Sequence, residues 1–426
     1  MFILAIFVFL FWAIIACYIL TKSTFISRAN LTKWEIVGIF LLKIAFGCLY
    51  GYIHNRNINV QVADTWQYYN ESVPLTKLLL HKPKLFFLDL FSNAYPNSSD
   101  IFTTSNSYYN DLKKNLMLFI MSICNLLTGS NYYANVVLYN FVNLFGLVAL
   151  YRFCISYITL PYRVIKCTLF LLPTTLFWCS GFHKEGILLS ALGFLLFAFY
   201  LIINKIKIDN QLLTITICLL ILFIFRPYIL FFLIPLLLLW VSVTYYKLPP
   251  KLYLWPSICV FLTVLFFTTS LVVPQLNLAN YTAQIQNNFL QLTANTKLTS
   301  TKLLPTLSSY STYLPIALYT AFIAPLGQML KLPYLPTVAE NILILLLVVT
   351  AVCNHKNQKR NNTALFFICF AGYLYLFLGY TIPITGAIIR YKSIFTPLLI
   401  LGLLQYNGYL LGVVKKFYIK FSRKHN

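Results

Sequence analysis

Charged residues are scarce in this sequence, and acidic residues are the scarcest. Only 10% of the 426 residues are charged, 60% are hydrophobic and the mean hydropathy is +0.77, which lies outside the usual range of soluble domains. Apolar runs long enough to cross a hydrocarbon core recur along the whole length, so no sizeable soluble domain remains. The composition therefore predicts an all-α, polytopic membrane helix bundle in which residues 1–426 form a single transmembrane domain.

The sequence also lacks paired cysteines and a cleavable leader. Its ten cysteines are scattered singly, with no CxxC pair and no His/Cys spacing typical of zinc. The first apolar run, MFILAIFVFLFWAIIACYIL, has no basic n-region and no small-x-small cleavage site. We therefore expect no disulfide framework and no zinc site, and we expect the first run to remain as a span.

Positive charge is abundant, at a net +23, but its distribution argues against nucleic-acid binding. Nucleic-acid binders gather lysine and arginine on one soluble face, whereas here these residues occupy short loops between apolar runs and the tail KKFYIKFSRKHN. Such a distribution is typical of a topology signal, with some attraction to anionic lipids. The expected partners therefore include membrane lipids and exclude nucleic acid.

Eleven apolar runs are expected to cross the membrane: 1–21, 34–53, 135–156, 164–181, 186–204, 211–225, 227–245, 253–273, 337–353, 363–381 and 393–412. Two further stretches, 115–128 and 312–329, are short or broken by proline and glycine. If neither crosses, the basic loops share one side with the C-terminal tail, which places the N-terminus outside and the C-terminus in the cytoplasm. If both cross, thirteen spans result and several basic loops move outside, so we prefer eleven.

This topology leaves two long external loop regions, residues 54–134 and 274–336. Each carries an amphipathic or re-entrant piece. The stretch PLTKLLLHKPKLFFLDLF mixes lysine with bulky apolar residues and suits a helix in the headgroup plane. Loops of this length are more often functional than idle.

One carboxylate, Asp64, lies among aromatic residues in the stretch QVADTWQYYNES, soon after the second expected span. Trp66, Tyr68 and Tyr69 can stack on a sugar ring, while Asp64 acts as a general base towards a hydroxyl, and Glu71 follows within the same stretch. The plain alternative is an aspartate that caps the next helix, beside an ordinary interfacial belt of aromatics.

The stretch FWCSGFHKEGILL places His183, Lys184 and Glu185 between two apolar runs. In the plain interpretation, Ser180 caps a helix and Glu185 lies at the helix N-terminus, where negative charge is favoured. Lys184 has the wrong sign for that position, and at the outer interface it can bind a phosphate. The stretch is therefore a candidate substrate-binding site.

Arg226 lies within a long apolar stretch, IFRPYILFF, and Pro227 breaks the helix beside it. An arginine at membrane depth costs several kcal/mol, so it normally faces a cavity or a partner. If Pro227 instead marks a hairpin tip, Arg226 is an ordinary snorkelling residue.

Arg390 and Lys392, in TGAIIRYKSIFTPLL, lie outside in the expected topology, where the positive-inside rule disfavours them. An anionic partner is therefore expected. The planar guanidinium of Arg390 suits a phosphate or pyrophosphate, and Tyr391 can flank it. The alternative is a simple interfacial anchor.

The order of these stretches resembles the GT-C superfamily of polytopic glycosyltransferases over most of the chain. ADTWQYYNES is similar to the position and Asp-x-x-x-Tyr neighbourhood of the acidic residue in the first external loop of that superfamily. IIRYKSIFTPLL is similar to the Arg-Tyr-(Arg/Lys)-x-x-x-x-Pro stretch before a late span in such enzymes and in polysaccharide-assembly proteins. FWCSGFHKEG and FRPY are similar to stretches in bacterial envelope-polysaccharide membrane proteins.

The resemblance implies a glycosyltransferase at the outer face of a bacterial inner membrane. The donor would be a polyprenyl-phosphate- or diphosphate-linked sugar, and the acceptor a glycan or lipid. By the resemblance Asp64 would be the base. Our own hypothesis for the donor phosphate is that Arg390 holds it together with Lys392, Lys184 or Arg226. No cofactor is required, although some relatives use a divalent cation, for which Asp64 and Glu71 can supply oxygen ligands.

Three alternatives remain open. A repeat-unit polymerase of the O-antigen or capsule type would depend more on Arg226 and Arg390 than on Asp64. A polysaccharide or lipid transporter or flippase is disfavoured because the two halves show no internal repeat and no broken helices in corresponding positions. A purely structural membrane subunit is disfavoured by the long external loops.

Overall fold

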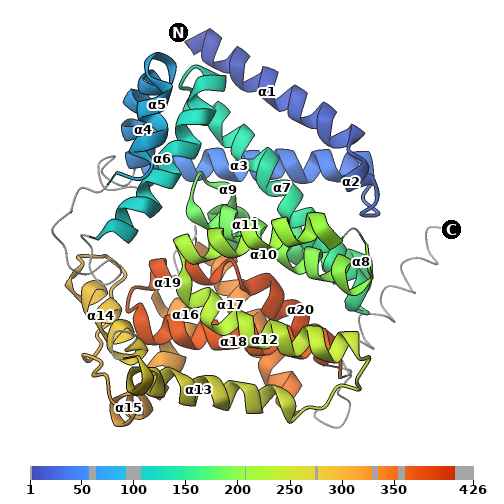
Figure 1. Ribbon diagram of the computed structural model, residues 1–426, viewed down its shortest axis with the longest axis vertical. Coiled ribbons are helices and arrows are strands. Elements are labelled where there is room, and N and C mark those ends of the chain that lie inside the picture. The colour runs from blue at the N-terminus through green and yellow to red at the C-terminus, as the bar shows by residue number, and fades with distance from the viewer. Residues whose placement is uncertain are drawn as a thin grey trace. The chain divides into compact units, whose positions relative to one another are not determined.

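The computed structural model describes residues 2–56, 64–92, 107–206, 208–273, 277–328, 334–353 and 360–407. Over these ranges the regular structure is helical (Figure 1). They contain no named strand, and one isolated antiparallel bridge pairs Lys297 with Ile384. The predicted all-α class is confirmed.

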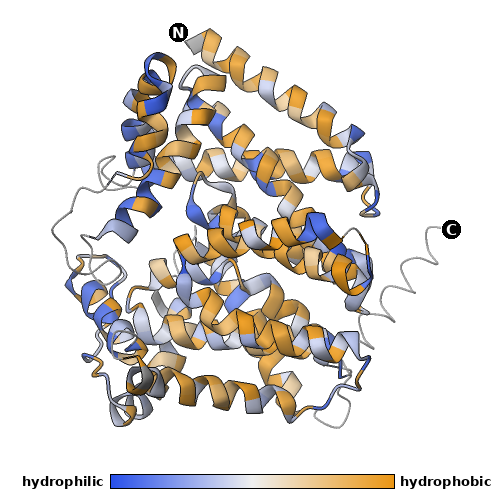
Figure 2. Ribbon diagram, viewed as in Figure 1, coloured by the Kyte–Doolittle hydropathy of each residue, from blue (hydrophilic) through white to orange (hydrophobic). Residues whose placement is uncertain are grey.

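Nine helices in the described ranges are long and apolar enough to cross a membrane, and each coincides with an expected span. Orange, the colour of apolar residues, covers most of their length in Figure 2. The chain is therefore a multi-pass membrane protein. The nine helices are α1 (Phe2–Lys22), α3 (Lys33–Arg56), α7 (Tyr132–Tyr157), α10 (Lys184–Ile203), α11 (Ile208–Phe225), α12 (Pro227–Tyr245), α13 (Leu254–Val272), α17 (Leu335–Cys353) and α18 (Asn362–Thr381).

The expected span at 164–181 is not one helix. It is divided into α8 (Tyr162–Phe170) and α9 (Pro173–Ser180). Pro173 is the first residue of the second helix, a position where its missing N–H costs little because the first N–H groups of a helix have no partner within it. An apolar run of sufficient length is therefore not by itself a continuous span.

The expected span at 393–412 also differs from the structure. α20 (Thr396–Tyr406) follows α19 (Thr385–Lys392) with a bend of 66° between them. Residues 408–412 lie outside the described residues. By length and composition, nine of the described helices could cross a membrane, or ten segments if this bent pair is one span, whereas eleven spans were expected.

Both long segments between spans contain helices. The first holds α4 (Asp64–His81), α5 (Pro83–Asp89) and α6 (Tyr108–Thr128), and the second holds α14 (Leu278–Gln291), α15 (Leu307–Leu318), η1 (Tyr319–Ile323) and α16 (Ala324–Gln328). The stretch PLTKLLLHKPKLFFLDLF is helical, as expected, over most of its length. A short helix, α2 (Thr24–Ser27), follows α1. Parts of the expected loops and the basic tail lie outside the described residues, at 57–63, 93–106, 274–276, 329–333, 354–359 and 408–426.

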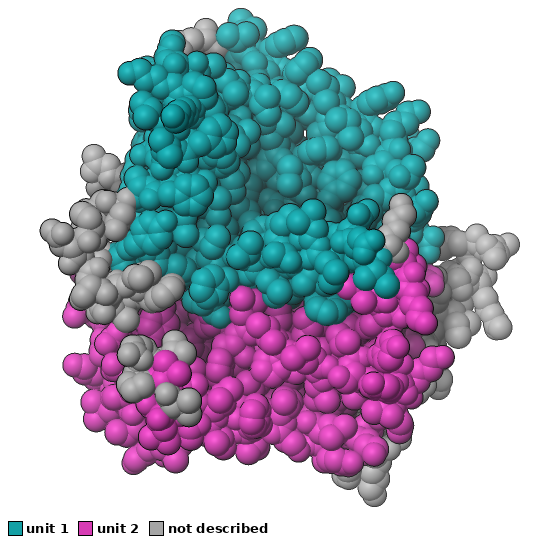
Figure 3. Space-filling view, viewed as in Figure 1, with its two compact units in different colours: residues 1–153, 175–201, 207–227 teal, residues 154–174, 202–206, 228–426 magenta. Residues whose placement is uncertain are grey.

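The chain divides into two compact units, drawn in separate colours in Figure 3. Unit 1 contains residues 1–153, 175–201 and 207–227, and unit 2 contains residues 154–174, 202–206 and 228–426. The candidate residues from Asp64 to Arg226 therefore belong to unit 1. Arg390, Tyr391 and Lys392 belong to unit 2.

In unit 1, small residues bring α7 and α10 into close contact. A Cβ added to Gly193 would stand 2.1 Å from the carbonyl oxygen of Gly146, and one added to Gly146 would stand 2.4 Å from the Cβ of Ser190. Ser190 also donates a hydrogen bond of 2.9 Å to Oδ1 of Asn143. Small residues of this kind let helix backbones approach closely in membranes. The contact fixes α10, whose first turn carries Glu185.

Buried polar side chains hold α4 against α6 and α7 in the same unit. Asn125 donates to Oγ of Ser72 at 2.8 Å and accepts from Asn135 at 2.6 Å. Thr128 donates to Oδ1 of Asn135 at 2.6 Å. A buried network whose members bond to one another favours a single arrangement of its helices. It therefore helps to fix α4, which begins at Asp64.

Candidate functional site

The first turn of α4 is anchored by the two residues after Asp64. The hydroxyl of Thr65 donates to the carbonyl of Phe182 at 3.1 Å and bonds to the hydroxyl of Tyr132 at 2.8 Å. The indole of Trp66 stacks on Tyr132 with ring centres 4.2 Å apart, and its N–H donates to the carbonyl of Gly51 at 2.9 Å. Asp64 is thereby held beside the turn between α9 and α10.

Three contacts within unit 1 hold the turn between α9 and α10. The buried Lys43, on α3, donates to Oγ of Ser180 at 3.0 Å, near the carbonyl end of α9, where a cation is favoured. The hydroxyl of Tyr139 donates to the carbonyl of His183. A Cβ added to Gly181 would stand 2.4 Å from the ring of Tyr50, so only glycine fits there without displacement. These contacts fix the backbone that carries His183.

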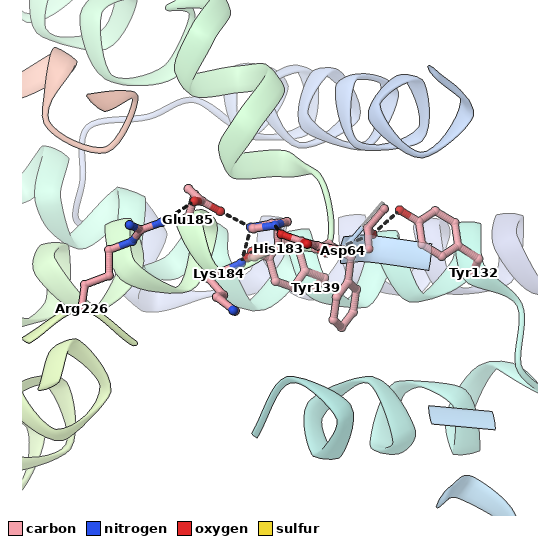
Figure 4. Close-up of polar contacts among 9 residues, drawn as sticks. Asp64, Tyr132, Tyr139, His183, Lys184, Glu185 and Arg226 are labelled. Atoms are coloured by element: carbon pink, nitrogen blue, oxygen red, sulfur yellow. Dashed lines mark hydrogen bonds and ion pairs between the residues drawn. The ribbon is translucent and has the colours of Figure 1, made fainter. Parts of the chain in front are cut away.

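Four charged or titratable side chains form a continuous row in unit 1 (Figure 4). Nε2 of His183 lies 3.0 Å from Oδ2 of Asp64, and Nδ1 of His183 bonds to Oε2 of Glu185. Arg226 donates from Nη2 to Oε1 of Glu185 at 3.0 Å. The side chains of His183 and Glu185 are fully buried, that of Arg226 is 10% exposed and that of Asp64 is 39% exposed. Asp64 is therefore the end of the row that solvent or a substrate can reach.

The partners of the row fix its geometry. Each ring nitrogen of His183 contacts one carboxylate, Nε2 that of Asp64 and Nδ1 that of Glu185. The backbone N–H of Lys184 also donates to Nδ1 of His183 at 2.9 Å. The guanidinium of Arg226 donates to the other oxygen of Glu185. These contacts hold His183 and Glu185 in place, and His183 in turn positions Oδ2 of Asp64.

Two lysines, each beside a tyrosine ring, accompany the row. Nζ of Lys184 lies 5.5 Å from the centre of the Tyr68 ring, and the lysine side chain points away from the row in Figure 4. The hydroxyl of Tyr109 on α6 donates to the carbonyl of Phe223 at 2.7 Å, which ties the start of α6 to the end of α11. Lys113, one turn further along α6, has its Nζ 3.9 Å from the Tyr109 ring centre. Cations from α6 and α10 therefore accompany the row.

Lys113 provides a test of these electrostatics. Burial, together with the positive charges of Lys184 and Arg226, lowers the pKa of Lys113 to about 7. Between about pH 7 and the ordinary lysine pKa of about 10.4, the unfolded chain holds a proton that the folded protein lacks, so this group makes stability rise with pH. Lys113→Met should flatten that rise, measured as the midpoint of thermal unfolding in detergent across this pH range.

Lys114→Met is the matched control for Lys113→Met. Lys114 is the next residue on α6, its side chain is 41% exposed and it forms an ion pair of 2.6 Å with Glu71. This control should leave the pH dependence of the midpoint as it is. An unchanged slope in Lys113→Met would contradict the argument.

The other residues predicted around Asp64 contact protein groups. Tyr69 donates to the carbonyl of Ser130 at 2.5 Å, and its ring packs edge-on against Trp66. Glu71 bonds to Lys114 and accepts from Gln67 at 3.0 Å. Their predicted contacts with a sugar stay predictions. The same holds for oxygen ligands to a divalent cation from Asp64 and Glu71.

The residues predicted around Arg390 lie in unit 2. The guanidinium of Arg390 is 5.1 Å from the ring centre of Tyr391, and that ring packs against Phe289. Lys392 is 3% exposed and donates to Oδ1 of Asn341 at 2.5 Å and to the carbonyl of Ala321 at 3.2 Å. Lys392 is therefore buried among protein partners, and Arg390 and Tyr391 are half-buried.

Sequence reasoning did not select Lys43, Lys113 or Tyr139. Lys43 could have been found, because it is a lone lysine within an expected span, the same signal that identified Arg226. Lys113 is one of several lysines in a long loop region, and Tyr139 is one of 31 tyrosines. Neither carries a local signal, since their positions depend on contacts between distant segments.

No family model matches the sequence, and no curated protein or solved structure matches the chain.

Proposed function

We propose that the protein is a membrane glycosyltransferase that moves a sugar from a polyprenyl-phosphate-linked donor to a glycan or lipid acceptor at the outer face of a bacterial inner membrane. The row that ends at Asp64 is the observation that carries this proposal. Its buried members orient one accessible carboxylate, which is what a general base requires. The membrane-spanning helices suit a substrate that carries a lipid anchor.

In the proposed reaction, Asp64 removes the proton from the acceptor hydroxyl as its oxygen attacks the anomeric carbon. The bond between that carbon and the donor phosphate breaks, and the phosphate leaves with the bonding electrons. Lys184 supplies positive charge for the leaving phosphate, with Lys113 adding to it when protonated. Stabilisation of developing charge is usually the largest catalytic contribution. His183 is a positioning residue, because its side chain is fully buried and bonds to Asp64.

The test replaces Asp64 by Asn in the native host and profiles envelope polysaccharides and lipid-linked intermediates. The expected result is loss of one sugar residue while the protein still inserts in the membrane. Asp209→Asn is the matched control, because Asp209 is an exposed acid in the first turn of α11. An unchanged glycan profile in the Asp64→Asn strain would contradict the proposal.

Arg390→Ala, tested in the same assay, separates the transferase from the repeat-unit polymerase. Accumulation of single repeat units in the Arg390→Ala strain, with normal glycans in the Asp64→Asn strain, would favour the polymerase. The reverse pattern would favour the transferase.

Transport is a second candidate, and unit 2 supplies the observation that favours it. Lys392 is buried at the end of α19, beside the 66° bend, and it donates to the carbonyl of Ala321 within the π-helix η1. Broken helices and π-helical turns that surround a buried charge are features of transport sites. Uptake or flipping of a labelled lipid-linked glycan by vesicles that contain the protein, abolished by Lys392→Met and retained in Asp64→Asn, would support transport.

A further inference from the structure

A cavity of about 300 Å³ lies in unit 2, among three candidate spans, α12, α13 and α18, and the helices α14 and α15. Its walls are rich in aromatic side chains: Phe232, Phe266, Phe267, Tyr310, Phe377 and Tyr380. The volume is about twice that of the ~150 Å³ apolar cavity that binds a benzene molecule in a protein core. The cavity is therefore large enough for a substantial apolar guest.

The polar groups in its walls are already bonded to the protein. Each hydroxyl donates to a backbone carbonyl at 3.1 Å or less, in Thr263, Thr282, Tyr310, Ser311, Tyr373 and Tyr380. A polar guest gives up its hydration water when it enters the cavity. It would find few hydrogen-bond donors in these walls to replace that water, so it would lose hydrogen bonds. The cavity therefore favours hydrocarbon over a sugar or a phosphate.

The walls are tied together, so the cavity is formed before any guest arrives. Tyr310 on α15 donates to the carbonyl of Ala279 on α14, and Tyr380 on α18 donates to the carbonyl of Tyr310, both at 2.9 Å. A Cβ added to Gly379 would stand 2.2 Å from the carbonyl oxygen of Ala317, so α18 and α15 are in close contact. A preformed site loses little conformational entropy on binding.

The wall residues also give the depth of the cavity. Thr263 lies about 14 Å of helix rise before the end of α13, and Phe232 lies about 8 Å after the start of α12. Both helices are candidate spans, and the hydrocarbon core that they cross is about 30 Å thick. Thr263 therefore lies midway along its span and Phe232 nearer to the start of its own, and both lie at acyl-chain depth.

We propose that this cavity binds the hydrocarbon chain of a membrane lipid. Lipid chains are the solvent of these spans, and only 11% of the residues from Leu254 to Leu271 in α13 are buried inside the protein. That helix is therefore accessible to lipid. The walls of an unfilled apolar cavity lack dispersion contacts on one side, and a hydrocarbon chain in the cavity supplies those contacts. The site is independent of the proposed sugar transfer, and either an acyl chain or a prenyl chain has the required chemistry.

Photocrosslinking tests the site. The full-length protein is reconstituted in vesicles of phosphatidylethanolamine and phosphatidylglycerol that contain a phospholipid with a diazirine midway along one acyl chain. After illumination, adducts are mapped by mass spectrometry. We expect enrichment at Phe266 and Tyr310 over Val260, which is 63% exposed on α13 and does not line the cavity.

Two substitutions fill the cavity from two of its lining helices, Leu376→Trp on α18 and Leu314→Trp on α15. Each should reduce the adducts at Phe266 several-fold, whereas Val264→Trp, on the exposed face of α13, should not. Only variants that elute like the native protein in size-exclusion chromatography are compared. If one filling variant fails to fold, the comparison uses the other. Wall adducts no more frequent than those at Val260, and unchanged by filling, would overturn the proposal.

A competing arm identifies the source of the chain. A polyprenyl phosphate is added at a small molar fraction of the phospholipid. A several-fold loss of adducts at Phe266, without a loss at Val260, would assign the site to a prenyl chain. Persistent adducts at Phe266 would assign it to an acyl chain of the bulk lipid. Both results support a hydrocarbon site, provided that the filling variants abolish the adducts.

Discussion

Arg226→Met is expected to lower the free energy of unfolding by about 3–5 kcal/mol, the usual cost of removing one partner of a buried ion pair. The side chain of Glu185 is fully buried and accepts from Arg226 at 3.0 Å. Without that guanidinium, Glu185 keeps its bond to His183 but loses its neighbouring permanent cation. The carboxylate must then either stay charged away from water or take up a proton, and both outcomes cost free energy.

The measurement is the unfolding free energy in mixed micelles titrated with dodecyl sulfate. Arg56→Met is the control, because Arg56 is an exposed cation at the end of α3 that lies 5.0 Å from the ring of Tyr52. The double variant Arg226→Met with Glu185→Gln should recover part of the loss, since it removes the unpaired charge. Equal losses in the Arg226 and Arg56 variants would contradict the importance of the buried pair.

A substitution within the row should reduce activity more than a substitution that only weakens the turn beside it. Glu185→Gln keeps the shape of the side chain but removes the charge that faces both His183 and Arg226. The imidazole then loses one of its two carboxylate partners, and the orientation of Asp64 depends on that imidazole. We expect the sugar transfer proposed above to fall more in Glu185→Gln than in Lys43→Met, which acts on the backbone of the same turn through Ser180. A comparable loss in both variants would indicate a purely structural role for the row.

Local sequence information was sufficient for the spans and insufficient for their breaks. An apolar run of suitable length almost requires a helix in the membrane, because every backbone polar group must be bonded within the segment. Nine expected spans coincide with helices for this reason. The runs at 164–181 and 393–412 are also long and apolar. Pro173 nevertheless begins a new helix inside the first run, and Pro397 lies in the first turn of α20, which follows the bend after α19. Counting apolar residues does not detect such breaks.

Three residues of the row could be selected from the sequence as candidates, but the contacts between them could not. Asp64, Glu185 and Arg226 were selected because charge is costly and rare in this chain. The structure joins them through His183, although Asp64 and His183 are 119 residues apart. Arg226 was expected to face a cavity or a partner, or to lie at a hairpin tip, and in the structure it bonds to a carboxylate 41 residues earlier. Its contact with a phosphate stays a prediction. Pairings over such separations depend on tertiary packing, which one sequence does not reveal.

Gly193→Ala is expected to destabilise unit 1 by about 3 kcal/mol, at the upper end of the usual cost of overpacking. The added methyl group would stand 2.1 Å from the carbonyl oxygen of Gly146 and 3.0 Å from its carbonyl carbon. Both atoms belong to the backbone of α7, so no side chain can rotate away. The two helices must separate, and the hydrogen bond from Ser190 to Asn143 must lengthen with them.

Gly38→Ala is the matched control, and its expected effect has the opposite sign. Gly38 lies within α3, where an added Cβ meets nothing within 4 Å. Alanine there should be neutral or stabilising by about 0.5–1 kcal/mol, because glycine is the poorer helix former. Unfolding free energies of the two variants, measured in the same mixed micelles, should therefore lie on either side of the native value. Equal values would contradict the close contact between α7 and α10.

The Gly193 substitution also tests how the row is held. Gly193 follows Glu185 by eight residues, or about 12 Å along α10. A displaced α10 would carry Glu185 away from Arg226, so the Gly193 and Arg226 substitutions would break the same ion pair. Their combined loss of unfolding free energy should then be smaller than the sum of the two separate losses, because a pair can be broken only once. Strictly additive losses would mean that α10 accommodates the methyl group without moving its first turn, and that the row at Glu185 is held independently of the α7–α10 contact.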